Sequence, residues 1–152
     1  MIEFKTDLWE YTSPSNKVIR CITTNGFVKD NGLAVMGRGT ARQAANKFKN
    51  LPRDLGTWIR QNGNIPHVFE CLSTYTLTVF TILTFPVKHN WWEEASLELI
   101  AESTEILRAM ALKTPDVIYL LPKPGCGNGL LNWDQVKPIM LRLPDNVLVI
   151  DK

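Results

Sequence analysis

The chain has 152 residues, of which 45% are hydrophobic and 21% are charged. This composition excludes wholesale disorder, and the length suits one domain with its own core, so we expect a single domain over residues 1–152. The formal net charge of +2 is too even to require a nucleic-acid or membrane partner, and it excludes neither.

Strands and helices are expected to alternate along the chain. Apolar and β-branched runs predict strands at 17–23, 68–72, 77–85, 117–121 and 147–150. Helical spacing and end signals predict a helix after Gly39, a second from Asn50 to Asn62, a long third ending near Lys113, and a fourth from Asn132 to about Leu141. Asn90 and Glu93 are expected to cap the third helix.

The cysteines and apolar segments bear on compartment and cofactors. Cys21, Cys71 and Cys126 form no CxxC pair, which argues against a disulfide framework and a structural zinc site. Residues 1–9 lack a signal-peptide pattern, and no apolar run approaches the ~20 residues that span a bilayer. We therefore expect a cytoplasmic, monomeric protein with no membrane partner, no metal and no cofactor.

Strand–helix alternation with short buried strands indicates an α/β sandwich around a mixed sheet. In such sheets, ligands bind at the carboxyl ends of parallel strands. Two glycine-rich segments, residues 24–39 and 125–129, each follow a buried strand and precede a helix. The sequence therefore predicts a ligand site between these two loops.

The first loop, residues 35–41, contains Gly37 and Gly39 just before a helix. Glycine lets backbone approach a ligand closely, and the amides of a helix N-terminus favour anions. A plain strand-to-helix connection remains the alternative. The second loop has three glycines in five residues, but it is neither a Walker A loop nor a dinucleotide fingerprint. We expect that positions 127 and 129 need small side chains because a ligand lies directly against Gly127 and Gly129.

Four segments together resemble the macro domain family: Asn25 and residues 35–41, 84–88 and 125–133, in the family's order. The resemblance runs from about Lys5 to Ile150. The chain most resembles the branch that includes terminal ADP-ribose protein glycohydrolase. Within that branch, it is most similar to the antitoxin macro domains that remove ADP-ribose from DNA. The resemblance implies a three-layer α/β/α sandwich around a mixed, largely parallel sheet. The implied ligand is ADP-ribose, free or attached to DNA, RNA or protein.

The same resemblance implies roles for individual residues. Asp7 would accept the adenine amino group with Leu8 beside it, Asn25 would hydrogen-bond the distal ribose, and Lys88 would be the catalytic residue next to that ribose. The diphosphate would be held by Gly37, Gly39 and Thr40 in the first loop and by Gly125, Cys126, Gly127, Asn128, Gly129 and Leu130 in the second. Asp7 could instead cap a turn, and Cys126 could be a nucleophile or a small loop filler.

Two departures from the family pattern matter. Residues 29–34 look inserted, and Gly129 stands where the glycohydrolase has a catalytic Asp. The antitoxin branch also has glycine there and depends on its lysine, which favours Lys88. Lys88 could act as a neutral nucleophile or as an ammonium ion. The leading hypothesis is an ADP-ribosyl hydrolase. A non-catalytic reader of ADP-ribose and an ADP-ribose 1″-phosphate phosphatase remain alternatives. Trp91 and Trp92 could stack on a base or cover the third helix.

Overall fold

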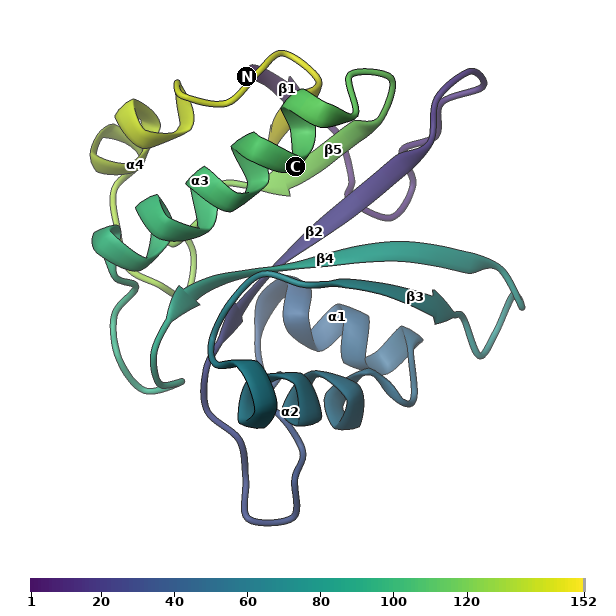
Figure 1. Cartoon of the computed structure of the whole chain (residues 1–152), viewed down its shortest axis with the longest axis vertical. Coiled ribbons are helices and arrows are strands. Elements are labelled where there is room, and N and C mark those ends of the chain that lie inside the picture. Colours follow the sequence, from purple (N-terminus) through teal and green to yellow (C-terminus); the bar gives the residue numbers. More distant parts are fainter. Residues whose placement is uncertain (152) are drawn as a thin grey trace.

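The computed structural model describes residues 1–151, which form a six-stranded sheet flanked by four helices (Figure 1). The strands are β1 (Ile2–Lys5), β2 (Val18–Asn25), β3 (Val68–Leu72), β4 (Val79–Lys88), β5 (Ile118–Pro122) and β6 (Val147–Asp151). The helices are α1 (Gly39–Lys47), α2 (Leu51–Asn62), α3 (Leu97–Lys113) and α4 (Trp133–Met140). The strand order is β1-β6-β5-β2-β4-β3, and neighbouring strands are parallel except for the antiparallel pair β3–β4.

The sheet separates two hydrophobic cores, which confirms the predicted three-layer sandwich. In Figure 1, α3 and α4 cover one face of the sheet, and α1 and α2 cover the other. Successive side chains of a strand point to opposite faces, and β2 shows the consequence. Cys21 packs into the core beneath α3 and α4, whereas Ile22 packs into the core with α1 and α2. Both side chains are fully buried, so β2 lies at the centre of the fold.

The helices follow the local signals in the sequence. In α1, Ala41 and Ala44 are buried, and Phe48 is buried at the C-cap, as the apolar spacing predicts. Pro52 lies in the first turn of α2, where its missing N–H costs no hydrogen bond. Asn132 and Gln135 form the predicted capping box of α4. Among the described residues, no helix is long and apolar enough to cross a membrane.

The predicted start of the third helix is wrong. α3 begins at Leu97, and the hydroxyl of Ser96 caps it by accepting a hydrogen bond from the amide of Leu99 at 3.2 Å. The side chains of Asn90 and Glu93 instead bond each other at 2.7 Å in the preceding loop. The amide of Ser96 also donates to the carbonyl of Val87 in β4 at 2.9 Å, so a contact with the sheet fixes the residue that caps the helix.

One strand boundary and one whole strand also differ from the prediction. β4 continues past Phe85 to Lys88, so Lys88 is the last residue of a strand rather than part of a loop. β1 was not predicted, because all of its residues are exposed and it pairs only with β6 at the edge of the sheet. Both differences bear on the site, since Asp7 follows β1 and Lys88 ends β4.

Candidate functional site

A cavity of about 850 Å³, here called the cleft, runs across the carboxyl ends of the parallel strands. The residues that end or follow these strands line it, in sheet order Asp7, Asp151, Lys123, Asn25 and Lys88. Asp7 and Lys88 are therefore at opposite ends, four inter-strand spacings of about 4.8 Å apart, or roughly 19 Å. A cleft of this form suits an extended ligand whose two ends differ in chemistry.

The first loop forms one wall of the cleft and leads directly into α1. Gly39 has a φ of +60°, which favours glycine, and a Cβ built on it would lie 3.3 Å from the side-chain nitrogen of Asn128. The two glycine loops therefore meet over the cleft. Arg38 occupies the N-cap of α1 and has no acceptor atom to offer the first-turn amides. The hydroxyl of Thr40 accepts a hydrogen bond from the amide of Thr23 at 3.3 Å, which ties the helix to β2.

The second loop uses its glycines in two different ways. A Cβ on Gly129 would lie 2.6 Å from the carbonyl oxygen of Gly125 and 2.7 Å from the Cβ of Ala95. The loop's own packing therefore requires glycine at this position, which also lines the cleft, so the close approach of a ligand is not the only reason for a glycine there. A Cβ on Gly127 would meet nothing within 4 Å, and Gly127 lines the cleft.

All of the predicted site residues line the cleft except Leu130. Leu130 has a φ of +64°, and its side chain is 72% exposed. Its amide donates to the carbonyl of Gly127 at 3.1 Å, so it helps to close the second loop. The structure thus gives Leu130 a place in the loop's backbone turn, outside the cleft lining.

Lys88 is held at one end of the cleft by two carbonyl groups. Its Nζ donates to the carbonyl oxygens of Asn128 at 3.1 Å and Trp91 at 3.4 Å. Burial, and secondarily the nearby Arg38 cation, lower the pKa of Lys88 below its usual range. Both protonation states satisfy these two carbonyls: an ammonium donates two of its three N–H groups, and a neutral amine donates both of its N–H groups and keeps its lone pair.

Asn25 pairs with Lys88 across β2 and β4, next to an irregularity in the strand register. Its side-chain nitrogen donates to the carbonyl of Val35 at 3.0 Å, and its side-chain oxygen accepts from the amide of Phe27 at 2.9 Å. Asn25 thus fixes both ends of the segment that leaves β2 and returns to the first loop. The pairing brings Asn25 and Lys88 to the same end of the cleft.

The insertion at residues 29–34 forms a tight hairpin packed against α2. The amide of Lys29 donates to the carbonyl of Leu33 at 2.9 Å, and Arg60 of α2 donates to the carbonyl of Lys29 at 2.8 Å. A Cβ on Gly56 would lie 2.0 Å from the carbonyl oxygen of Gly32, so helix and hairpin touch backbone to backbone. The hairpin thereby brings Lys29 into the lining of the cleft.

Asp7 lies at the other end of the cleft, and both of its predicted roles fit its position. Its Oδ1 accepts hydrogen bonds from the amides of Trp9 at 2.8 Å and Glu10 at 3.2 Å, so it caps a turn. It also lines the cleft together with Leu8, whose side chain is buried. The turn holds the carboxylate in a fixed orientation beside the cavity.

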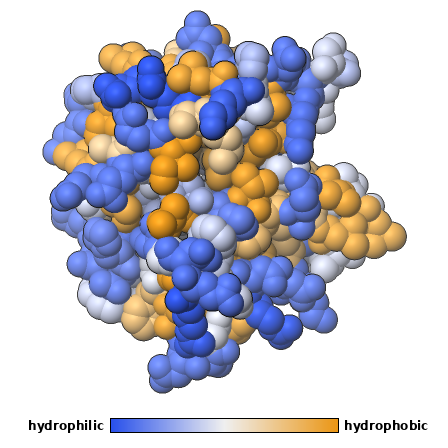
Figure 2. Space-filling view, in the orientation of Figure 1, coloured by the Kyte–Doolittle hydropathy of each residue, from blue (hydrophilic) through white to orange (hydrophobic). Residues whose placement is uncertain are grey.

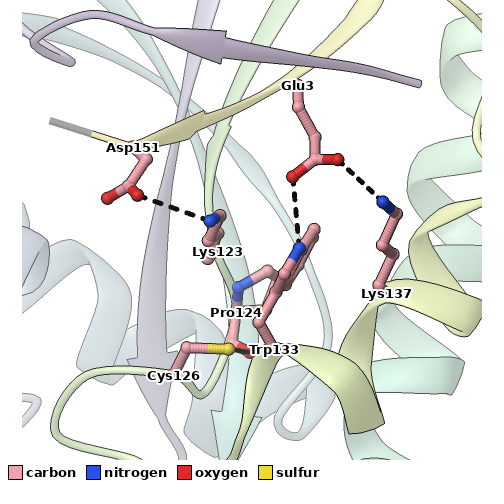
Figure 3. A network of polar contacts seen from close by, with 7 residues as sticks. All are labelled: Glu3, Lys123, Pro124, Cys126, Trp133, Lys137 and Asp151. Carbon is pink, nitrogen blue, oxygen red and sulfur yellow. Dashed lines mark hydrogen bonds and ion pairs between the residues drawn. The ribbon is translucent and has the colours of Figure 1, made fainter.

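An ion pair that the sequence did not predict lies in the lining of the cleft. Lys123, directly before the second loop, lies 3.4 Å from the carboxylate of Asp151 (Figure 3). Its ammonium also lies 4.8 Å from the centre of the Trp133 ring, a cation–π distance. Trp133 in turn donates to Glu3 of β1 at 3.1 Å, so this network ties α4 to the edge strand (Figure 3). The position of Lys123 beside a glycine loop was the available signal.

Cys126 faces the cleft without the environment of a nucleophile. Its Sγ lies 3.5 Å from the carbonyl oxygen of Pro124, as a weak donor (Figure 3). Burial raises the pKa of the Cys126 thiol, although Lys123 acts in the opposite direction. His67 stacks on Trp58 with ring centres 3.7 Å apart and is not among the residues of the cleft. These contacts favour the small-filler role for Cys126.

Charge and exposed aromatic rings distinguish the Lys88 end of the cleft. The charged lining residues are Lys29, Arg38, Lys88 and Lys123 against Asp7 and Asp151. Phe27, Trp92 and Trp91 form a chain of edge-to-face contacts, with ring centres 5.5 and 5.4 Å apart. Both tryptophans are about half exposed. The cationic excess suits an anionic ligand, and the rings flank the entrance beside Lys88.

Among residues 1–151, no three or more His, Cys, Asp or Glu side chains are grouped to hold a metal ion.

Comparison with known proteins gives matches among solved structures. No family model and no curated protein sequence matches the chain. The macrodomain of Mycobacterium tuberculosis DarG is similar with a TM-score of 0.74 and 19% identity, over 99% of this chain and 97% of that one. The macrodomain of Thermus aquaticus DarG gives 0.69 and 23%, over 99% and 96%.

A third similar structure is Thermosipho africanus DarTG in complex with ADP-ribose, with a TM-score of 0.69 and 19% identity. The match covers 90% of this chain and 38% of that one, so the chain corresponds to well under half of DarTG. At these identities the likeness concerns the fold. This likeness shows that the chain has the macrodomain fold, in agreement with the strand order, the helices on both faces of the sheet and the cleft at the strand ends.

Proposed function

We propose that the chain binds ADP-ribose along the cleft and hydrolyses the bond between ADP-ribose and a modified nucleic acid or protein. The observation that carries the proposal is the order of groups along the strand ends. An acceptor, Asp7, lies at one end, two amide-rich loops lie at the centre, and Lys88 lies at the other end. The complex of Thermosipho africanus DarTG with ADP-ribose supports it.

Each part of ADP-ribose has a counterpart in this order. The adenine amino group donates to Asp7. The diphosphate lies between the two glycine loops at the N-terminus of α1, where backbone amides and nearby cations stabilise negative charge without a metal. The distal ribose then reaches Asn25 and Lys88, and the attached substrate leaves the cleft beside Trp91 and Trp92.

Lys88 acts at the anomeric carbon of the distal ribose. Its neutral amine attacks that carbon while the glycosidic bond breaks, and the leaving group takes the electron pair and the proton that the amine loses. Water then attacks the same carbon and displaces the amine, and the proton that the water loses passes to the nitrogen of Lys88, which restores the neutral amine and gives ADP-ribose. The carbonyls of Asn128 and Trp91 orient the nitrogen for the first step.

Turnover is expected to rise with pH through the pKa of Lys88. Burial and then Arg38 hold this pKa below the usual lysine range, so the reactive amine forms at a lower pH than it would in an exposed lysine. The measurement is kcat from about pH 6 to 10, with folding followed by circular dichroism. An ammonium that acts only electrostatically gives the opposite result, a decrease in kcat as pH rises.

Asp7→Asn is expected to weaken ADP-ribose binding by about 1–3 kcal/mol, the cost of an unsatisfied buried donor. Asparagine keeps one oxygen for the amides of Trp9 and Glu10, and it replaces the other with an NH₂ group that cannot accept from adenine. Titration calorimetry measures the change. Equal affinity in parent and variant would show that Asp7 only caps the turn.

The proposed reaction is tested by incubating the protein with ADP-ribosylated DNA, ADP-ribosylated protein and ADP-ribose 1″-phosphate in parallel. Release of ADP-ribose from DNA or protein, with the phosphate ester unchanged, is the expected result. Preferential release of phosphate would make the protein a phosphatase. Tight binding of ADP-ribose without turnover of any of the three would make it a reader.

A further inference from the structure

Arg20 is buried in an unusual place for a charged residue. Among the described residues it is the only charged one that is buried, with 8% of its surface exposed. It lies on the central strand β2, and its guanidinium group lies 5.1 Å from the centre of the Phe80 ring. Burying a cation is costly unless hydrogen bonds replace its hydration, so the partners of this group indicate its use.

Both hydrogen-bond acceptors of Arg20 belong to the segment that carries Asp7. The Nε of Arg20 donates to the carbonyl oxygen of Leu8 at 2.8 Å, and an Nη donates to the carbonyl oxygen of Tyr11. Leu8 is the first residue of the turn that Asp7 caps, and Tyr11 directly follows that turn. The guanidinium group holds the two carbonyls with separate donors at a fixed planar spacing. A lysine ammonium offers all of its donors from one nitrogen atom, and an apolar side chain of the same length offers none.

The surroundings of Arg20 leave it little freedom to move. Phe80 packs on Phe48 and Trp9, with ring centres 5.6 and 6.2 Å apart. Trp9 also donates from its indole nitrogen to Gln43 of α1 at 2.8 Å. The segment at residues 7–11 is therefore held by Arg20 of β2 and by Gln43 of α1. These contacts fix the position of the Asp7 carboxylate relative to the cleft.

We infer that Arg20 is a positioning residue for recognition of the base, holding the Asp7–Leu8 segment so that the cleft distinguishes adenine from other purines. The inference rests on the proposed binding of ADP-ribose and adds the origin of base specificity. Arg20 itself does not line the cleft, so it acts through the backbone of Leu8 and Tyr11.

Base discrimination gives a readout that a general loss of stability does not change. In inosine diphosphate ribose, a carbonyl oxygen replaces the amino group that would donate to Asp7. The parent is expected to bind ADP-ribose about tenfold more tightly than this analogue, the scale of one buried hydrogen bond. In Arg20→Met the preference should fall to about twofold or less, because Asp7 loses its fixed orientation. KM should rise with kcat nearly unchanged, since Lys88 lies at the far end of the cleft.

The matched control is Arg108→Met. Arg108 is on α3, and its Nε also donates to a backbone carbonyl, that of Arg142, at 3.0 Å, outside the cleft. This variant should keep the parent's base preference. Arg20→Lys keeps the charge and is milder for folding. It should give an intermediate preference, because one ammonium cannot hold both carbonyls in the geometry of the fork.

The possible results separate the inference from the function on which it depends. A parent that binds neither nucleotide overturns both. A parent that prefers ADP-ribose, with Arg20→Met and Arg20→Lys each retaining the full preference, overturns the role of Arg20 alone. A parent that binds both nucleotides equally also overturns the inference and leaves ADP-ribose binding intact. Loss of the preference in both variants, with the Arg108 control unchanged, supports it.

Discussion

Replacing Lys88 by alanine is expected to lower the turnover of an ADP-ribosylated substrate by about two orders of magnitude or more, the usual scale for losing a catalytic group. The affinity for ADP-ribose should change by no more than a few fold, because the interactions of Lys88 with the reacting carbon develop in the transition state. Turnover is measured by release of ADP-ribose and affinity by calorimetry.

A lysine outside the cleft provides the control. Lys49 is exposed and is not among the cleft residues, so Lys49→Ala should match the parent in both measurements. Lys88→Arg adds a chemical distinction, since arginine keeps the positive charge but supplies no neutral amine. It should fail to restore turnover. Full turnover in Lys88→Ala would remove this residue from the mechanism, and full turnover in Lys88→Arg would make its role electrostatic.

Replacing Gly127 by valine is expected to weaken ADP-ribose binding by about 10- to 100-fold, the range for forcing methyl groups into an occupied site. Gly127 lines the cleft, and a Cβ there enters open space where the diphosphate is proposed to lie. Its φ is not in the left-handed region, so valine is compatible with the backbone. The thermal midpoint should therefore stay close to that of the parent.

Gly129→Ala is the contrasting variant in the same loop. Its added methyl group would collide with the backbone of Gly125 and with Ala95, so it should lower the thermal midpoint. Thermal unfolding and calorimetry on both variants separate the two effects. A Gly127→Val protein that binds ADP-ribose as well as the parent would place the ligand elsewhere.

The parts of the fold that were predictable have a strong local signal. β5 and the apolar residues of β2 are recognisable because these strands are buried on both faces, and α4 carries its own capping box. β1 gives no such signal, since an exposed edge strand needs no apolar pattern. α3 starts at a cap residue, Ser96, whose amide bonds Val87 of β4, and a local sequence pattern does not reveal such a contact.

The site was predictable where a residue's place depends on the end of an element. Asn25, Lys88 and the glycine loops line one cleft because the carboxyl ends of parallel strands converge. Lys123 and Arg20 were missed, since their importance comes from partners far away in the sequence, Asp151 and the carbonyls of Leu8 and Tyr11. The reason for Gly129 also became visible only with the position of Ala95.

The most direct test of the account is titration calorimetry of the whole chain with ADP-ribose in the presence of a metal chelator. Two amide-rich loops, a cationic excess and Asp7 predict saturable binding of one ADP-ribose per chain without any metal. Adding the ligand should also raise the thermal midpoint, since it binds the folded state. No heat of binding and no thermal stabilisation at about millimolar ADP-ribose would contradict the account.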